Sequence, residues 1–136
     1  MLSFCLMFTS VTFSSEPSSL HIKTVERFIT AFNAHDSSAM ASFVGNDIEW
    51  LSISGDQITV EVKGKGNLIE SMNAYFKSCP TCSSELSSAI SSINKVSAVE
   101  VASWKDARGS KSQRAVSVYE FSEGKIIRVY YFSAEK

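Results

Sequence analysis

The spacing of apolar residues changes along this chain, and the change limits the folds that it can adopt. In "TVERFITAFNAHD" apolar side chains recur every three or four residues, which places Val25, Phe28, Ile29 and Phe32 on one helical stripe. From Asp47 onwards apolar and polar side chains alternate, as in β-strands, with one return to helical spacing at residues 64–78. Early helices followed by a run of strands predict an α+β domain.

Local signals place the remaining elements. Asp36 is a good N-cap for a second, short helix that buries Ala39, Met40, Phe43 and Val44. The segments "IEWLSIS" and "QITVEV" around "SGD" predict a β-hairpin, and Pro80 ends the third helix, "GKGNLIESMNAYFKS". Four strand-like runs follow: "SELSSAISSIN", "KVSAVEVASW", "RAVSVYEF" and "KIIRVYYF", with turn glycines at 109 and 124.

Size and charge exclude several classes of partner. A chain of 136 residues suits one domain with one core. The net charge is −1 and the charges are mixed, so we expect no nucleic-acid partner. No apolar run is long enough to span a bilayer, so we expect no stable membrane span.

The first 15 residues carry no charged side chain and run from apolar to small and hydroxylated residues. This pattern predicts a signal peptide over 1–15, a linker over 16–23 and a domain over 24–136, in a periplasmic or secreted protein. The missing basic residue near the start leaves a buried N-terminal strand, and a cytoplasmic location, as the alternative. Cleavage near Ser15 would remove Cys5 and leave two cysteines.

The segment "RFITAFNAHDSSAMASFVGNDIEW" resembles the opening of nuclear transport factor 2-like proteins, a superfamily that includes ketosteroid isomerase and the SnoaL-like polyketide cyclases. The closing "YEFSEGKIIRVYYF" is also similar, so the resemblance runs from Thr24 to Phe132. It implies a cone, in which a curved antiparallel sheet wraps around three helices of the N-terminal half. An apolar pocket lies at the open end of such a cone.

The catalytic residues of ketosteroid isomerase have no counterparts here. That enzyme uses a carboxylate base, a tyrosine and a protonated aspartate. Counting from "FNAHD" places the tyrosine at Phe28 and the base at Ser52 or Leu51, and matching "YEFSEGK" places the aspartate at Ser117. Phenylalanine donates no hydrogen bond and serine alone is a poor base, so the resemblance implies the fold without this chemistry.

Strand alternation indicates which side chains face the pocket. Glu100 is the most informative, because it interrupts an apolar strand on the face that carries Trp104. Among aromatic side chains it could serve as an acid or base, and our best catalytic candidates are Glu100 and Tyr119. It could equally face solvent or accept hydrogen bonds from tyrosine or tryptophan. The predicted pocket residues are Trp50, Ser52, Tyr75, Glu100, Trp104, Ser117, Tyr119, Val129 and Tyr131.

Cys79 and Cys82 follow the third helix, in "FKSCPTCSS". Redox-active pairs usually lie at a helix N-terminus, where the dipole stabilises a thiolate, whereas this pair lies at a C-terminus. We therefore expect a structural disulfide that closes a tight loop; free thiols in a cytosolic protein, or a redox or metal role, are the alternatives.

No metal or cofactor is expected. His35 lies in a turn and is expected in solvent, and His21 lies in the predicted linker. Two separated histidines and one cysteine pair do not make a zinc site, and "GKGKG" lacks the ending of a phosphate loop.

Two functions follow. The first is binding of a small, largely apolar molecule in the pocket, with the question of catalysis left open; acid–base isomerisation, dehydration or cyclisation is the reaction class that the resemblance implies. The second is a non-catalytic homodimerisation or association module that uses the outer sheet face, with Ile126, Arg128, Tyr130 and Phe132 facing out.

Overall fold

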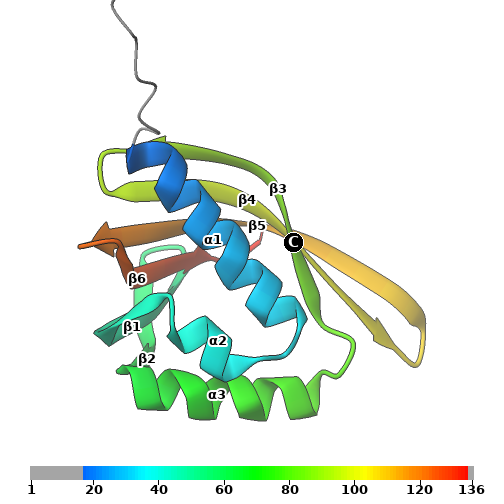
Figure 1. Ribbon diagram of the computed structural model, residues 1–136. Helices are drawn as coiled ribbons and strands as arrows, with labels where there is room; N and C mark the ends of the chain where they lie inside the picture. Colours follow the sequence, from blue (N-terminus) through cyan, green and yellow to red (C-terminus); the bar gives the residue numbers. More distant parts are fainter. Residues whose placement is uncertain (1–16, 135–136) are drawn as a thin grey trace, which may run out of the picture.

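The computed structural model describes residues 17–134, with side chains from residue 20 onwards (Figure 1). The predicted signal peptide and Cys5 lie outside the described residues. In chain order the elements are α1 (Pro17–Asn33), α2 (Ser37–Ala41), β1 (Val44–Ser54), β2 (Gln57–Lys63), α3 (Lys65–Ser78), β3 (Ser83–Ser92), β4 (Lys95–Asp106), β5 (Gly109–Ser122) and β6 (Lys125–Phe132).

Helix α1 begins earlier than its apolar stripe suggested. Residues 17–23, expected to be a linker, form its first turns instead. Proline is tolerated in the first turn of a helix, because that N–H has no partner within the helix. Ile22 packs partly buried against the core and His21 stacks on Phe121 with ring centroids 4.2 Å apart, so tertiary contacts hold this segment.

The short helix α2 begins as expected and ends sooner. The Asp36 carboxylate accepts a hydrogen bond from the Ala39 backbone N–H at 2.9 Å, which confirms the predicted N-cap. The helix ends at Ala41, and Val44 begins β1 rather than belonging to α2. At α3 the turn comes from Gly64, whose φ of 93° strongly favours glycine.

The six strands form one curved sheet in the order β2-β1-β6-β5-β4-β3 (Figure 1). Every neighbouring pair is antiparallel except β1 and β6, which run parallel. The helices lie on the concave side, as expected for an α+β cone. No helix in the described part of the chain is long and apolar enough to cross a membrane.

Strand β6 departs from simple alternation. Glu120 pairs with Arg128 while the next residue, Phe121, pairs with Ile126, so Ile127 is an extra residue, as in a β-bulge. The extra residue of this bulge places Ile126 on the inner face of the sheet, where it is fully buried. The prediction that Ile126 faces out is therefore wrong, because alternation cannot be extended across a bulge.

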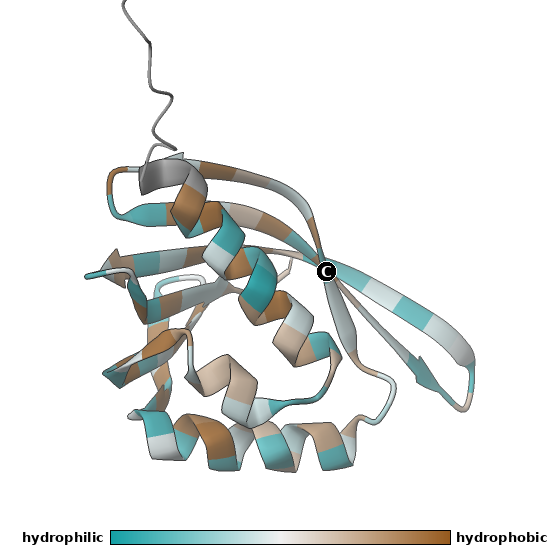
Figure 2. Ribbon diagram, in the orientation of Figure 1, coloured by the Kyte–Doolittle hydropathy of each residue, from teal (hydrophilic) through white to brown (hydrophobic). Residues whose placement is uncertain are grey.

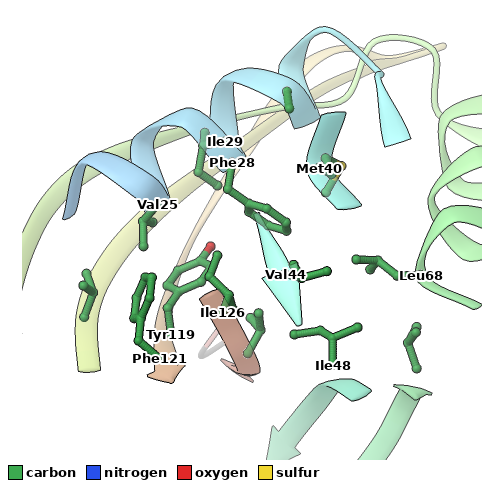
Figure 3. Close-up of a cluster of buried hydrophobic side chains, with 14 of the residues drawn as sticks. Val25, Phe28, Ile29, Met40, Val44, Ile48, Leu68, Tyr119, Phe121 and Ile126 are labelled. Carbon is green, nitrogen blue, oxygen red and sulfur yellow. The ribbon is translucent and has the colours of Figure 1, made fainter. Parts of the chain in front are cut away.

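The core lies between α1 and the concave face of the sheet. Phe28 packs edge-on against Tyr119, with ring centroids 6.1 Å apart, and Ile126 and Ile48 fill the space beneath α1 and beside α3 (Figure 3). Brown, apolar bands recur along α1, between teal ones, and on the strands that lie behind it (Figure 2). Burial of such side chains stabilises the fold by about 1.5–3 kcal/mol each.

Candidate functional site

A cavity of about 640 Å³ lies between α1, α3 and the concave face of the sheet. Its lining is mostly aromatic and apolar, and it includes Phe28 and Phe32 from α1, Met72 and Tyr75 from α3, Trp50 from β1 and Trp104 from β4. Rings from different elements meet around it: the ring centroids of Phe28 and Trp50 lie 6.3 Å apart, and those of Phe32 and Tyr75 lie 5.9 Å apart. The cavity has the size and polarity typical of small-molecule pockets.

The structure brings together six of the nine residues selected from the sequence. Trp50, Tyr75, Glu100, Trp104, Tyr119 and Tyr131 line the cavity. Ser117 and Val129 are fully buried in the layer beneath it. Ser52 pairs with Tyr131 across β1 and β6 but does not line the cavity. All three are direct cross-strand partners of lining residues: Ser52 and Ser117 pair with Tyr131, and Val129 pairs with Trp50 and Tyr119.

Glu100 is buried, with 5% of its surface exposed, and it lines the cavity. Three hydroxyl groups donate hydrogen bonds to its carboxylate. Ser117 donates to Oε1 at 2.6 Å, Tyr119 donates to the same oxygen, and Ser84 donates to Oε2 at 3.1 Å. No cation forms an ion pair with Glu100 among residues 20–134. The hydroxyl groups therefore replace the water that burial removes.

The Tyr119 hydroxyl is committed to Glu100. Burial raises the pKa of Tyr119 well above its ordinary value, and the negative charge of Glu100 raises it further. The phenol therefore remains neutral and acts as a hydrogen-bond donor to the carboxylate. Because that proton is already shared with Glu100, Tyr119 positions the acid rather than offering a free donor to the cavity.

Two other phenols face the cavity with unused hydroxyl groups. Tyr131 and Tyr75 both line it, and neither hydroxyl bonds to any group in the described part of the chain. Burial raises the pKa of Tyr131, followed by the charge of Glu100 and the neighbouring Tyr75; burial alone raises the pKa of Tyr75. Both remain neutral donors at physiological pH, available to a bound molecule.

Ser84 is a site residue that the sequence did not reveal. It lies on β3, where serines are frequent, and nothing in the local pattern distinguishes it. Its position depends on Asn33 at the end of α1. The Asn33 amide donates to the Ser84 carbonyl at 2.8 Å and accepts from the Ser84 N–H at 2.7 Å. These two bonds fix β3 beside α1 and hold the Ser84 hydroxyl on Glu100.

The cysteine pair lies at the rim of the cavity. Cys79 and Cys82 are disulfide-bonded, as expected, and both line the cavity. His35 holds the loop from the other side: its Nε2–H donates to the Cys82 carbonyl at 2.9 Å, and its ring stacks on Phe76 at 4.4 Å. The expectation that His35 lies free in solvent is wrong, because Phe76 and the disulfide loop, both distant in the sequence, half-bury the ring.

A family model supports the resemblance seen in the sequence. Residues 25–129 match the model of the SnoaL-like domain, which is most of the chain. No curated protein matches the chain.

Solved structures of similar fold cover most of this chain. An uncharacterised cystatin-fold protein from Novosphingobium aromaticivorans is 21% identical, with a TM-score of 0.73 over 83% of this chain and 97% of that one. A protein from Jannaschia sp. CCS1, provisionally assigned as a SnoaL-like polyketide cyclase, is 12% identical, with a TM-score of 0.72 over 89% and 90%. TerC, co-crystallised with polyporic acid, is 15% identical, with a TM-score of 0.69 over 85% and 92%. At these identities the similarity establishes a shared fold.

Proposed function

This chain belongs to the SnoaL-like family of the nuclear transport factor 2-like superfamily, and we propose that it binds a small, largely apolar molecule in the cavity between α1, α3 and the sheet. The observation that carries the proposal is the aromatic cavity with one buried carboxylate, Glu100, in its wall. Apolar surface supplies affinity in such pockets, and a few polar groups fix the orientation of the ligand.

Acid–base chemistry is the reaction class that best fits this wall. Glu100 would accept a proton from the substrate, and Tyr131 would donate a hydrogen bond to the substrate oxygen on which negative charge develops. Tyr131 replaces Tyr119 as the candidate donor, because the Tyr119 hydroxyl is bound to Glu100. The provisional cyclase assignment of the Jannaschia protein and the co-crystallisation of TerC with polyporic acid are consistent with a small organic ligand.

An exported location forms part of the proposal. The Cys79–Cys82 disulfide favours an oxidising compartment, since cytosolic thiols are usually kept reduced. This agrees with the expected leader over residues 1–15. Mass spectrometry of the exported protein would give the cleavage site, the two-proton loss of the disulfide and any retained ligand.

The binding test uses anilinonaphthalene, a neutral aromatic dye whose fluorescence rises in apolar surroundings. Ala102→Phe introduces a ring at a residue that lines the cavity. We expect the wild-type chain to bind the dye and Ala102→Phe to raise its Kd by about tenfold or more, equivalent to about 1.4 kcal/mol. Ile90→Phe is the matched control, because Ile90 is 72% exposed and lies away from the cavity.

The two possible failures have different meanings. A wild-type chain that does not bind the dye would contradict the pocket function. Equal binding by wild type and a folded Ala102→Phe variant would place the dye elsewhere and would also contradict it. Thermal unfolding of each variant verifies that the added ring has not unfolded the domain.

A second candidate is homodimerisation through the outer face of the sheet. One row of cross-strand partners on that face is apolar across five strands, from β2 to β4, and ends at Ser88 on β3: Ile58, Ile53, Phe132, Val116 and Val99. Ile58 is 67% exposed and Val116 is 47% exposed. Exposed apolar side chains in a continuous row are typical of an association surface. A second copy of the chain would present the same row, so the surface is self-complementary about a two-fold axis.

A further inference from the structure

A second hollow adjoins the cavity and differs from it in polarity. It has a volume of about 290 Å³ and lies between the α3–β3 loop and the β4–β5 hairpin. Ser83, Ser103 and Trp104 line both spaces, so the two lie side by side. We call the second space the lysine hollow, because Lys105 and Lys111 line it together with Thr81, Ser110 and Ser112.

The lysine hollow is positively charged. Lys111 is the cross-strand partner of Trp104, so its stem starts from the concave face of the sheet beside the mouth of the cavity. Neither Lys105 nor Lys111 forms an ion pair within residues 20–134. The segment 105–114, "KDARGSKSQR", carries four basic residues and one acidic residue, in a chain whose net charge is −1. The local field therefore favours an anion.

The backbone around the hollow is held in place. The Lys105 N–H donates to the Thr81 hydroxyl at 2.9 Å, and that hydroxyl donates to the Lys105 carbonyl at 3.3 Å. These bonds join the disulfide loop to β4. The part of the hairpin that extends beyond the helices shows mostly teal and pale bands, in contrast to the brown bands on the strands beneath α1 (Figure 2).

We propose that the lysine hollow binds the anionic group of an amphipathic ligand whose apolar part occupies the cavity. This rests on the proposed pocket function and adds the chemical class of the ligand. Two carboxylates, Glu100 and Glu61, line the cavity and would repel an anion placed inside it. The ligand therefore enters with its neutral end towards Glu100, and Trp104 separates its apolar part from its charged part.

A matched pair of dyes tests the proposal. Anilinonaphthalene sulfonate carries the ring system of anilinonaphthalene together with one fixed negative charge. Fluorescence titration gives the Kd of each dye for the wild type and for Lys105→Gln/Lys111→Gln. We expect the double variant to raise the Kd of the sulfonate about fivefold, as the loss of two partly screened charges implies, and to leave that of the neutral dye within about twofold.

A second double variant, Lys23→Gln/Lys63→Gln, controls for overall charge. Lys23 and Lys63 are exposed and line neither the cavity nor the lysine hollow. Their replacement removes two positive charges, as Lys105→Gln/Lys111→Gln does. It should leave both Kd values unchanged. The rise in the Kd of the sulfonate caused by Lys105→Gln/Lys111→Gln should also disappear at about 1 M NaCl, where the Debye length is about 3 Å.

The outcomes separate the two proposals. If neither dye binds the wild type, the pocket function itself fails. If the neutral dye binds but the sulfonate responds equally to both double variants, or to neither, the pocket function stands and the lysine hollow is not an anion site. A selective loss of sulfonate affinity in Lys105→Gln/Lys111→Gln supports the proposal.

Discussion

At the scale of single residues, Glu100 is the least ordinary feature of the molecule. An ionised carboxylate is costly to bury, and this one has no cationic partner among the described residues. Its three hydroxyl donors each contribute about 1.5–3 kcal/mol, the range for hydrogen bonds to charged groups. The carboxylate can thus be retained in an aromatic wall at a modest net cost.

Removing this charge should change the titration of the cavity phenols. Burial raises the pKa of Tyr131 and the negative charge of Glu100 raises it further, so Glu100→Gln should lower that pKa. The pKa should remain above 10.0, the ordinary value, because the burial persists. Nuclear magnetic resonance of ring-labelled tyrosine across an alkaline titration measures the pKa of Tyr131 in the wild type and in Glu100→Gln.

Glu49→Gln is the control for this titration, since Glu49 pairs with Arg128 on the outer face. An unchanged Tyr131 pKa in a folded Glu100→Gln variant would show that the carboxylate does not act on the cavity. If Glu100→Gln unfolds, the titration of the wild type still tests whether burial raises the pKa of Tyr131. A Tyr131 pKa at its ordinary value would contradict the burial of this phenol.

At the scale of elements, the site depends on how α1 meets β3. The strand β3 lies at an edge of the sheet, where backbone groups lack a neighbouring strand. Asn33 satisfies two of these groups on Ser84, and Ser84 in turn bonds to Glu100. A residue at the end of a helix therefore orients a carboxylate on β4 without touching it.

Asn33→Ala should lower both stability and ligand affinity. Two part-buried hydrogen bonds are lost, which should cost about 1–3 kcal/mol in urea unfolding. The Kd for anilinonaphthalene should rise as well, because β3 forms part of the cavity wall through Ser83 and Ser84.

Asn67→Ala is a suitable comparison, because Asn67 donates one exposed hydrogen bond, to the Lys63 carbonyl at 2.8 Å. Asn67→Ala should lower the free energy of unfolding by less than Asn33→Ala does, and it should leave the Kd for anilinonaphthalene unchanged. If both variants lower the free energy of unfolding equally, the two Asn33–Ser84 hydrogen bonds contribute no more than a surface contact.

At the scale of the whole molecule, the curved sheet has two faces with different roles. The concave face encloses the cavity, and the convex face carries the apolar row from Ile58 to Val99. Beside that row Arg128 donates to Glu120 at 2.6 Å and the Tyr130 hydroxyl donates to the same carboxylate at 3.0 Å. Tyr130 is thus held in a polar network, which makes Val116 the better residue for a test of association.

Val116→Lys should convert a dimer into a monomer. The ammonium would be buried against the apolar row of a second copy, without a partner. Sedimentation velocity at several protein concentrations measures the mass. Leu20→Lys makes a comparable change on α1, where Leu20 is 49% exposed, and should leave the dimer intact. A wild-type chain that is monomeric throughout would contradict the dimer proposal.

The sequence by itself determined the helices and strands, because hydrophobic spacing and caps act locally: the Asp36 cap, the hairpin and all three helices could be predicted from neighbouring residues. Local alternation also selected Glu100 and the strand aromatics of the cavity, Trp50, Trp104, Tyr119 and Tyr131, but it did not select Phe28 and Phe32 on α1. Only the tertiary structure decided the reversal of Ile126, the helical start at Pro17, the Asn33–Ser84 clamp and the lysine hollow. Each of these depends on which strand, helix or loop becomes the neighbour, and contacts between residues distant in the sequence leave no periodic signal in it.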